Sequence, residues 1–253
     1  MRRSRRHPKS FFAVLAVFLA SPVASAQVFE IEGRYWFARS DSQVRVERFG
    51  LATDIDLKKD LEVDDQGFPE ARITWSSGAT RLRFDFTPIR YSGDQNVTRT
   101  IVFNGRTYAL GTRVISKVDI NNLRLTWTYF LLRTPRLKIG PQLEGNGFLQ
   151  DLSLNAPALG LEQSSSLSVG APAVGLAVEF SPTRRWRIQG EVAGISVGRY
   201  GYFLRSEAGV RLTPARHVGI SAGYRTMDLN ADYERNFARL RIHGPFVGAS
   251  IHF

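Results

Sequence analysis

Apolar and polar residues alternate with a period of two along most of this chain, which is the pattern of a β-strand with two different faces. In the segment 122–131, Leu123, Leu125 and Trp127 share one face, while Arg124 and Thr126 share the other. The same alternation recurs at 29–37, 71–75, 81–86, 136–144, 186–192, 203–212 and 247–253. The sequence therefore predicts an all-β fold whose strands carry one apolar and one charged face.

The links between these segments are of two kinds. Short, turn-rich links occur at 76–80, 133–136, 181–185 and 213–216, and longer polar segments occur at 40–67, 92–117, 150–165 and 230–236. Short turns on one side and long loops on the other are typical of a transmembrane β-barrel with short periplasmic turns. We predict a closed antiparallel up-and-down barrel of about ten strands, or eight if the irregular runs at 92–117 are all loop.

The first 26 residues have the features of a cleaved secretory signal peptide. Five basic residues precede the apolar run 11–20, and Ala24 and Ala26 form the small-x-small pattern before a cleavage site. We expect a mature protein that begins at Gln27 and forms a single barrel domain, 27–253. Cleavage would lower the formal net charge from +11 to +6, so the residual charge argues little for nucleic-acid binding.

Composition excludes several other classes. The chain has no cysteine, which excludes a disulfide framework and a thiolate metal site. No apolar run of helix length follows residue 26, which excludes a helical membrane protein. A soluble periplasmic, lipocalin-like barrel with its apolar face inward stays open, because alternation alone does not distinguish the two.

Aromatic residues favour the membrane barrel. One group lies near the short turns or the C-terminus, namely Trp75, Trp127, Tyr129, Trp186 and Phe253. A second group lies toward the long-loop ends, namely Tyr35, Trp36, Tyr200 and Tyr202. Two such belts are expected at the two membrane interfaces.

The terminal segment "GPFVGASIHF" resembles the β-signal of Gram-negative outer-membrane proteins. Its alternate residues Val247, Ala249 and Ile251 are apolar or small, and the segment ends on Phe253. With "GYR" at 223–225, the chain resembles the small OmpA-like and OmpW-like outer-membrane barrels. The resemblance implies an outer-membrane location, assembly by the barrel assembly machinery, contact with outer-membrane lipid and lipopolysaccharide, and a monomer. Unlike OmpA, the chain is expected to carry no soluble peptidoglycan-binding domain after the barrel.

The charged faces identify the barrel interior as the candidate site. The predicted lumen-lining residues are Glu30, Glu32, Arg34, Arg72, Arg81, Arg83, Asp85, Arg124, Glu144, Arg187, Glu191, Arg205, Glu207, Arg211 and Arg225. One interpretation is an ion-pair network that fills the lumen of a structural or surface-interaction barrel. The other is a narrow passive pore that prefers anions, because arginines outnumber carboxylates in this set.

The sequence predicts no catalytic, metal or cofactor site. His217 and His252 lie at the short-turn end and not at the outer rim, and His243 lacks an evident Ser or Asp partner. A barrel-type protease or lipid-modifying enzyme is the alternative. The acidic segment 54–65 does not have the spacing of an EF-hand loop, so solvated carboxylates are expected there in preference to calcium ligands.

Overall fold

The computed structural model describes residues 27–45, 54–56, 66–96, 100–103, 106–109, 111–157, 161–198, 201–233 and 236–253. The predicted signal peptide, residues 1–26, lies outside this part of the chain. The described residues include no helix that is long and apolar enough to cross a membrane.

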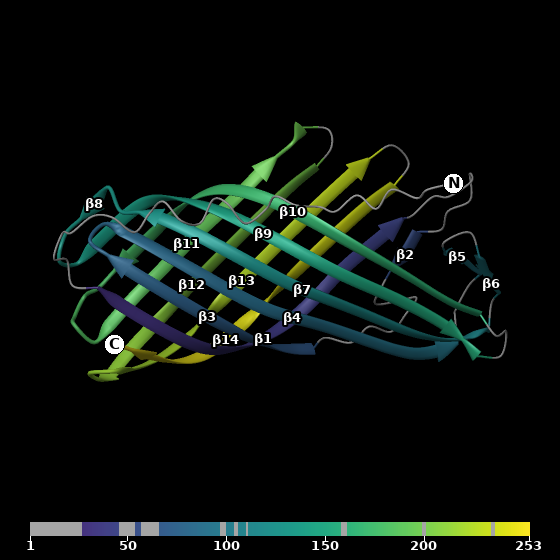
Figure 1. Cartoon of the computed structure of the whole chain (residues 1–253), viewed down its shortest axis with the longest axis horizontal. Coiled ribbons are helices and arrows are strands. Elements are labelled where there is room, and N and C mark those ends of the chain that lie inside the picture. Colours follow the sequence, from purple (N-terminus) through teal and green to yellow (C-terminus); the bar gives the residue numbers. More distant parts are fainter. Residues whose placement is uncertain are drawn as a thin grey trace, which may run out of the picture.

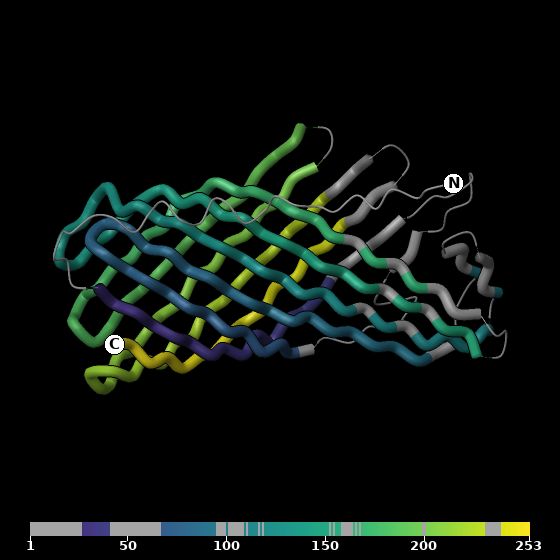
Figure 2. Tube along the Cα trace, viewed as in Figure 1, coloured from purple at the N-terminus to yellow at the C-terminus, as the bar shows by residue number. Residues whose placement is uncertain are grey.

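Ten long antiparallel strands close into a barrel, as the alternation predicts (Figure 1). They are β1 (Val28–Arg45), β3 (Gln66–Ser77), β4 (Thr80–Asn96), β7 (Arg113–Tyr129), β9 (Leu137–Ala156), β10 (Leu161–Phe180), β11 (Trp186–Ser196), β12 (Gly201–Ala215), β13 (Val218–Tyr233) and β14 (Asn236–His252). Each strand pairs with its neighbours in chain order, and pairing of β14 with β1 completes the ring. The strands cross the barrel wall at a marked tilt (Figure 2), as closure of a sheet requires.

The last strand ends against the first. Glu30 lies opposite His252, and the register continues along both strands to Arg45 opposite Phe237. The amide of Phe253 donates to the carbonyl oxygen of Phe29 at 2.9 Å. The terminal alternating segment therefore has a hydrogen-bonded strand on each side, and no open edge remains there.

Several polar segments predicted to be loops continue as strands. β9 runs to Ala156 and β10 begins at Leu161, so most of 150–165 is paired strand, and β13 and β14 likewise occupy most of 230–236. The segment 92–117 contributes the end of β4, the start of β7 and a small hairpin of β5 (Ile101–Phe103) and β6 (Arg106–Tyr108). At the other end, β8 (Leu132–Arg133) folds back on β9, and near the long loops β2 (Asp54–Asp56) pairs with β1.

The two strand faces separate by polarity, with apolar residues outward and charged residues inward. Ile31 and Leu125 are each 48% exposed, whereas the neighbouring Glu32 and Arg124 are 1% and 2% exposed. This orientation is opposite to the lipocalin-like alternative, whose apolar face would line the interior. The wall outside the lumen thus has the apolar surface that lipid requires.

An apolar layer fills the lumen toward the long-loop end. It comprises Trp36, Phe68, Ile89, Ile120, Phe148, Phe203, Met227, Ile242 and Phe246. Trp36 was expected in the outer aromatic belt, but it points inward, is 2% exposed and donates from Nε1 to the carbonyl oxygen of Gly244 at 3.2 Å. Its neighbour Tyr35 points outward, because successive side chains of a strand alternate.

Candidate functional site inside the barrel

A layer of buried charges crosses the lumen directly below the apolar layer. Among the described residues it contains six arginines and six carboxylates, and we call it the ionic layer. Its members are Glu32, Arg34, Glu70, Arg72, Arg83, Asp85, Arg124, Glu144, Glu191, Arg205, Glu207 and Arg225. Because the numbers of opposite charges are equal, the layer is electrically balanced.

Glu207 is the centre of the ionic layer. Its carboxylate accepts hydrogen bonds from Arg34 Nη1 at 2.7 Å, Arg225 Nε at 2.8 Å and Arg72 Nη1 at 3.2 Å. Glu207 lies on β12, and these arginines lie on β1, β13 and β3. One carboxylate thus ties together strands from a wide arc of the wall.

Other pairs span the lumen between strands that are not neighbours. Arg83 of β4 donates from Nη2 to Glu191 of β11 at 2.6 Å, and Arg205 of β12 pairs with Glu144 of β9. Such pairs fix distant strands relative to one another and occupy the space through which a solute would pass. Asp85 of β4 instead links neighbouring strands, because it accepts from Arg72 Nε of β3 at 2.5 Å and from Arg124 Nε of β7 at 3.0 Å.

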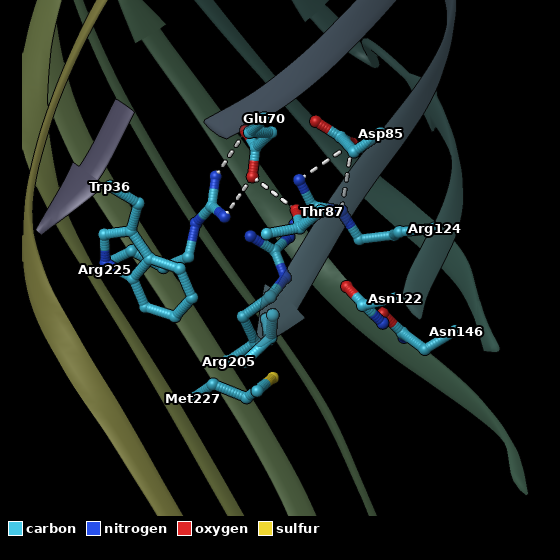
Figure 3. Close-up of a pocket in the computed structure, with 11 residues that line it drawn as sticks. Trp36, Glu70, Asp85, Thr87, Asn122, Arg124, Asn146, Arg205, Arg225 and Met227 are labelled. Carbon is cyan, nitrogen blue, oxygen red and sulfur yellow. Dashed lines mark hydrogen bonds and ion pairs between the residues drawn. The ribbon is translucent and has the colours of Figure 1, made fainter. Parts of the chain in front are cut away.

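The apolar and ionic layers contact each other at their junction. The guanidinium of Arg34 lies 4.4 Å from the ring centroid of Phe246, and that of Arg225 lies 5.1 Å from the Trp36 ring. The cavity at this junction has a volume of about 10 Å³ (Figure 3), enough for one water molecule. In Figure 3, Glu70 faces both Arg225 and Thr87, and Thr87 Oγ1 donates to Glu70 Oε2 at 2.9 Å.

Most of the predicted lumen-lining residues lie in or beside the ionic layer. Eleven of them belong to it, and Glu30 and Arg211 pair with each other at its lower border, where Arg211 Nη2 also lies 3.2 Å from Glu32. Arg81 and Arg187 lie nearer the short turns, in the cavity described below. The residues that the alternation placed on one face are therefore brought together inside the barrel.

Two buried carboxylates are missing from the predicted set, Glu70 and Glu179. Glu70 pairs with Arg225, and Glu179 pairs with Arg81. Both were detectable, since Glu70 shares a face with Arg72, and Glu179 alternates with the outward-facing Val178 and Phe180. Their inclusion removes much of the arginine excess on which the anion-pore interpretation rested.

A wider cavity, the vestibule, occupies the lumen at the short-turn end. Its volume is about 380 Å³. It is lined by Val28, Glu30, Arg72, Thr74, Ser76, Gly78, Thr80, Arg81, Arg83, Phe130, Lys138, Glu179, Arg184, Arg187, Gln189, Arg211, Thr213, Arg216 and His252. The ionic layer closes its inner end through Arg72 and Arg83, and residues of the short turns surround its other end, which is open.

The histidines lie away from the ionic layer. His243 points outward, and its Nδ1 lies 2.7 Å from the hydroxyl of Tyr224. His217 Nδ1 lies 2.9 Å from the carbonyl oxygen of His252 at the short-turn end. No cluster of three or more His, Asp or Glu that could hold a metal ion occurs among the described residues, and most of the acidic segment 54–65 lies outside them.

Comparison of the whole chain with solved structures supports the architecture. The outer membrane protease OmpT from Escherichia coli superposes with a TM-score of 0.60 at 9% sequence identity, covering 89% of this chain and 97% of that chain. The fold is that of an outer-membrane β-barrel. Ail of Yersinia pestis also matches, with a TM-score of 0.39 at 10% identity, covering 90% of this chain and 99% of that chain. No family model matches the sequence, and no curated protein does so.

Proposed function

We propose that this protein is a non-conducting outer-membrane barrel, which serves as a structural anchor for its surface-exposed end. The observation that carries the proposal is the ionic layer, which joins opposite walls of the lumen. Under this proposal the short turns and both ends of the domain 27–253 face the periplasm, and the long loops face the outside.

Opening the lumen would require separation of several buried ion pairs at once. A buried charge that loses its partner is strongly unfavourable, because its desolvation is no longer offset by a counter-charge. The carboxylate of Glu207 alone holds Arg34, Arg72 and Arg225. The apolar layer above, with Trp36 and Phe246 at its base, adds a second barrier to ions and water.

The length of the strands supports a role at the cell surface. About 9–11 tilted residues are enough to cross the hydrocarbon core, whereas β9 and β10 each contain 20 residues. Toward the loop end the outer wall becomes charged: Arg113 pairs with Asp94 at 2.8 Å, and Arg241 pairs with Asp228 at 2.8 Å. This part of the barrel suits an aqueous or headgroup environment outside the bilayer.

The remaining elements of the proposal follow from the resemblance and the apolar outer wall. The barrel would be inserted by the barrel assembly machinery, would contact outer-membrane lipid and lipopolysaccharide, and would act as a monomer without enzymatic activity. The likeness to OmpT, at 9% sequence identity, is one of fold alone.

Solute permeation tests this function. Mature protein reconstituted in liposomes should admit neutral and anionic small solutes no faster than protein-free liposomes, with a general porin as the positive control. Uptake above the protein-free rate by barrels that retain heat-modifiable migration on a denaturing gel would overturn the proposal in favour of a pore.

A further inference from the structure

The vestibule has the size and position of a binding cavity. Its volume of about 380 Å³ falls in the range of small-molecule pockets, about 300–1,000 Å³. Residues of three short turns, Gly78, Arg184 and Arg216, lie at its mouth, and the ionic layer closes its inner end. A ligand would therefore enter and leave by the short-turn mouth, which the proposed placement turns toward the periplasm.

The lining of the vestibule is strongly basic, unlike the balanced ionic layer. Eight of its residues are arginine or lysine, and two are carboxylates, Glu30 and Glu179. Both carboxylates are already paired, Glu30 with Arg211, and Glu179 with Arg81 and with Lys138 at 3.8 Å. The cavity thus carries uncompensated positive charge.

Arg72 and Arg83 are neutralised within the ionic layer, and Arg81 and Lys138 share Glu179, so most of the excess is located on three arginines. Within the part of the chain that the structure describes, the side chains of Arg184, Arg187 and Arg216 form no hydrogen bond or ion pair. Arg184 and Arg216 are exposed at the mouth, whereas Arg187 is half-buried on the wall beside Gln189. Arg187 interacts electrostatically with Glu179 but forms no ion pair with it, and the Glu179 carboxylate is paired with Arg81.

Unused hydrogen-bond donors provide an independent indication of a ligand. The Nε–H groups of Arg81, Arg83 and Arg211 are buried and have no hydrogen-bond partner among the described residues. All three side chains line the vestibule, and hydroxyls of Thr74 and Thr213 also line it. Buried donors of this kind normally bind an acceptor.

We propose that the vestibule binds a small polyanion that bears phosphate groups. Guanidinium groups present planar pairs of donors that match phosphate oxygens, and a ligand with several negative charges would neutralise the excess on Arg184, Arg187 and Arg216. The phosphate belongs to a soluble molecule or to a lipid headgroup of the inner leaflet. A soluble molecule is favoured, because the mouth lies inside the ring of short turns and not on the lipid-facing wall.

Calorimetric titration of tripolyphosphate into the detergent-solubilised full-length mature protein tests the site. Saturable binding is expected, with an affinity at least about tenfold weaker in Arg187→Gln, because one charge-assisted contact is lost. Arg113→Gln removes the same charge near the other end of the barrel and should bind as the wild type does. Absence of saturable binding, or equal loss in both variants, would overturn the proposal.

Two further measurements keep the test decisive. If Arg187→Gln loses heat-modifiable migration, Gln189→Glu replaces it, because a carboxylate on the same wall should also weaken binding without removing an arginine.

Nanodiscs distinguish the two sources of phosphate. Tripolyphosphate binding that persists with anionic phospholipid supports a soluble ligand, and binding lost specifically in anionic nanodiscs supports a lipid phosphate as the source. Equal binding of sulfate and tripolyphosphate would contradict a polyphosphate site.

Discussion

Arg225 and Glu70 are 155 positions apart in the chain, yet Arg225 Nη2 donates to Glu70 Oε1 at 2.9 Å inside the barrel. Arg225 lies on β13 and Glu70 on β3, with β14 and β1 between them in the wall. The pair therefore forms across the lumen and not along a strand ladder. Ion pairs of this type are formed by the inward-facing charges that the alternation predicts, and they support the proposed absence of conduction because they cross the lumen.

Replacement of the central carboxylate should destabilise the barrel strongly. Glu207→Gln leaves Arg34, Arg72 and Arg225 with one buried positive charge in excess, a change that costs about 3–5 kcal/mol. Urea unfolding of the micellar protein, followed by tryptophan fluorescence, measures this loss. Asp94→Asn, which breaks an exposed ion pair with Arg113, is the control and should leave the midpoint nearly unchanged. Similar midpoints for the two variants would show that the ionic layer does not stabilise the fold.

The apolar layer should stabilise the barrel independently of the ionic layer. Phe246 is 1% exposed and packs over Arg34, so Phe246→Ala should cost about 3–5 kcal/mol through the cavity that it leaves. Val247→Ala, on the lipid-facing side of the same strand, should cost much less. Because the ionic layer stays intact, Phe246→Ala should also remain silent in conductance recordings, and channel activity in this variant would place the barrier in the apolar layer alone.

The cost of a charged residue on the outer wall should depend on its depth in the bilayer. Leu125 lies outward in the short-turn half of β7, and Leu125→Arg should lower stability by an amount between the cost at the interface, about 0–1 kcal/mol, and the cost at the bilayer midplane, about 2–4 kcal/mol. Lys117, which is exposed nearer the loop end of the same strand, should accept Leu with little effect. Refolding yields into lipid vesicles compare the two, and equal yields would contradict the assigned membrane position.

The ends of the mature chain give predictions about export. Protein from outer membranes should begin at Gln27, which N-terminal mass spectrometry checks, and an intact Met1 would refute cleavage. Phe253→Ser should reduce the heat-modifiable, assembled fraction several-fold in cells, although Phe253 is largely exposed and contributes little packing. Unchanged assembly would show that Phe253 does not act as a recognition signal.

The alternation predicted the strands and their facing because lipid and the lumen impose opposite polarity on the two faces. It failed to predict the strand ends at 150–165 and 230–236, where both faces of the strand can be polar while backbone pairing continues. The inward position of Trp36 was also missed, because an aromatic residue suits either an interface or the apolar layer. The cross-lumen partners depend on strand order and register over more than one hundred residues, which local patterns do not contain.

Single-channel recording of the refolded mature protein in a planar bilayer tests the interrupted lumen most directly. With folding verified by heat-modifiable migration, we expect no conductance steps above the bare membrane, because the ionic layer and the apolar layer close the passage in series. Reproducible anion-preferring steps, reduced when Arg124 and Arg187 are neutralised, would contradict this account and establish a pore.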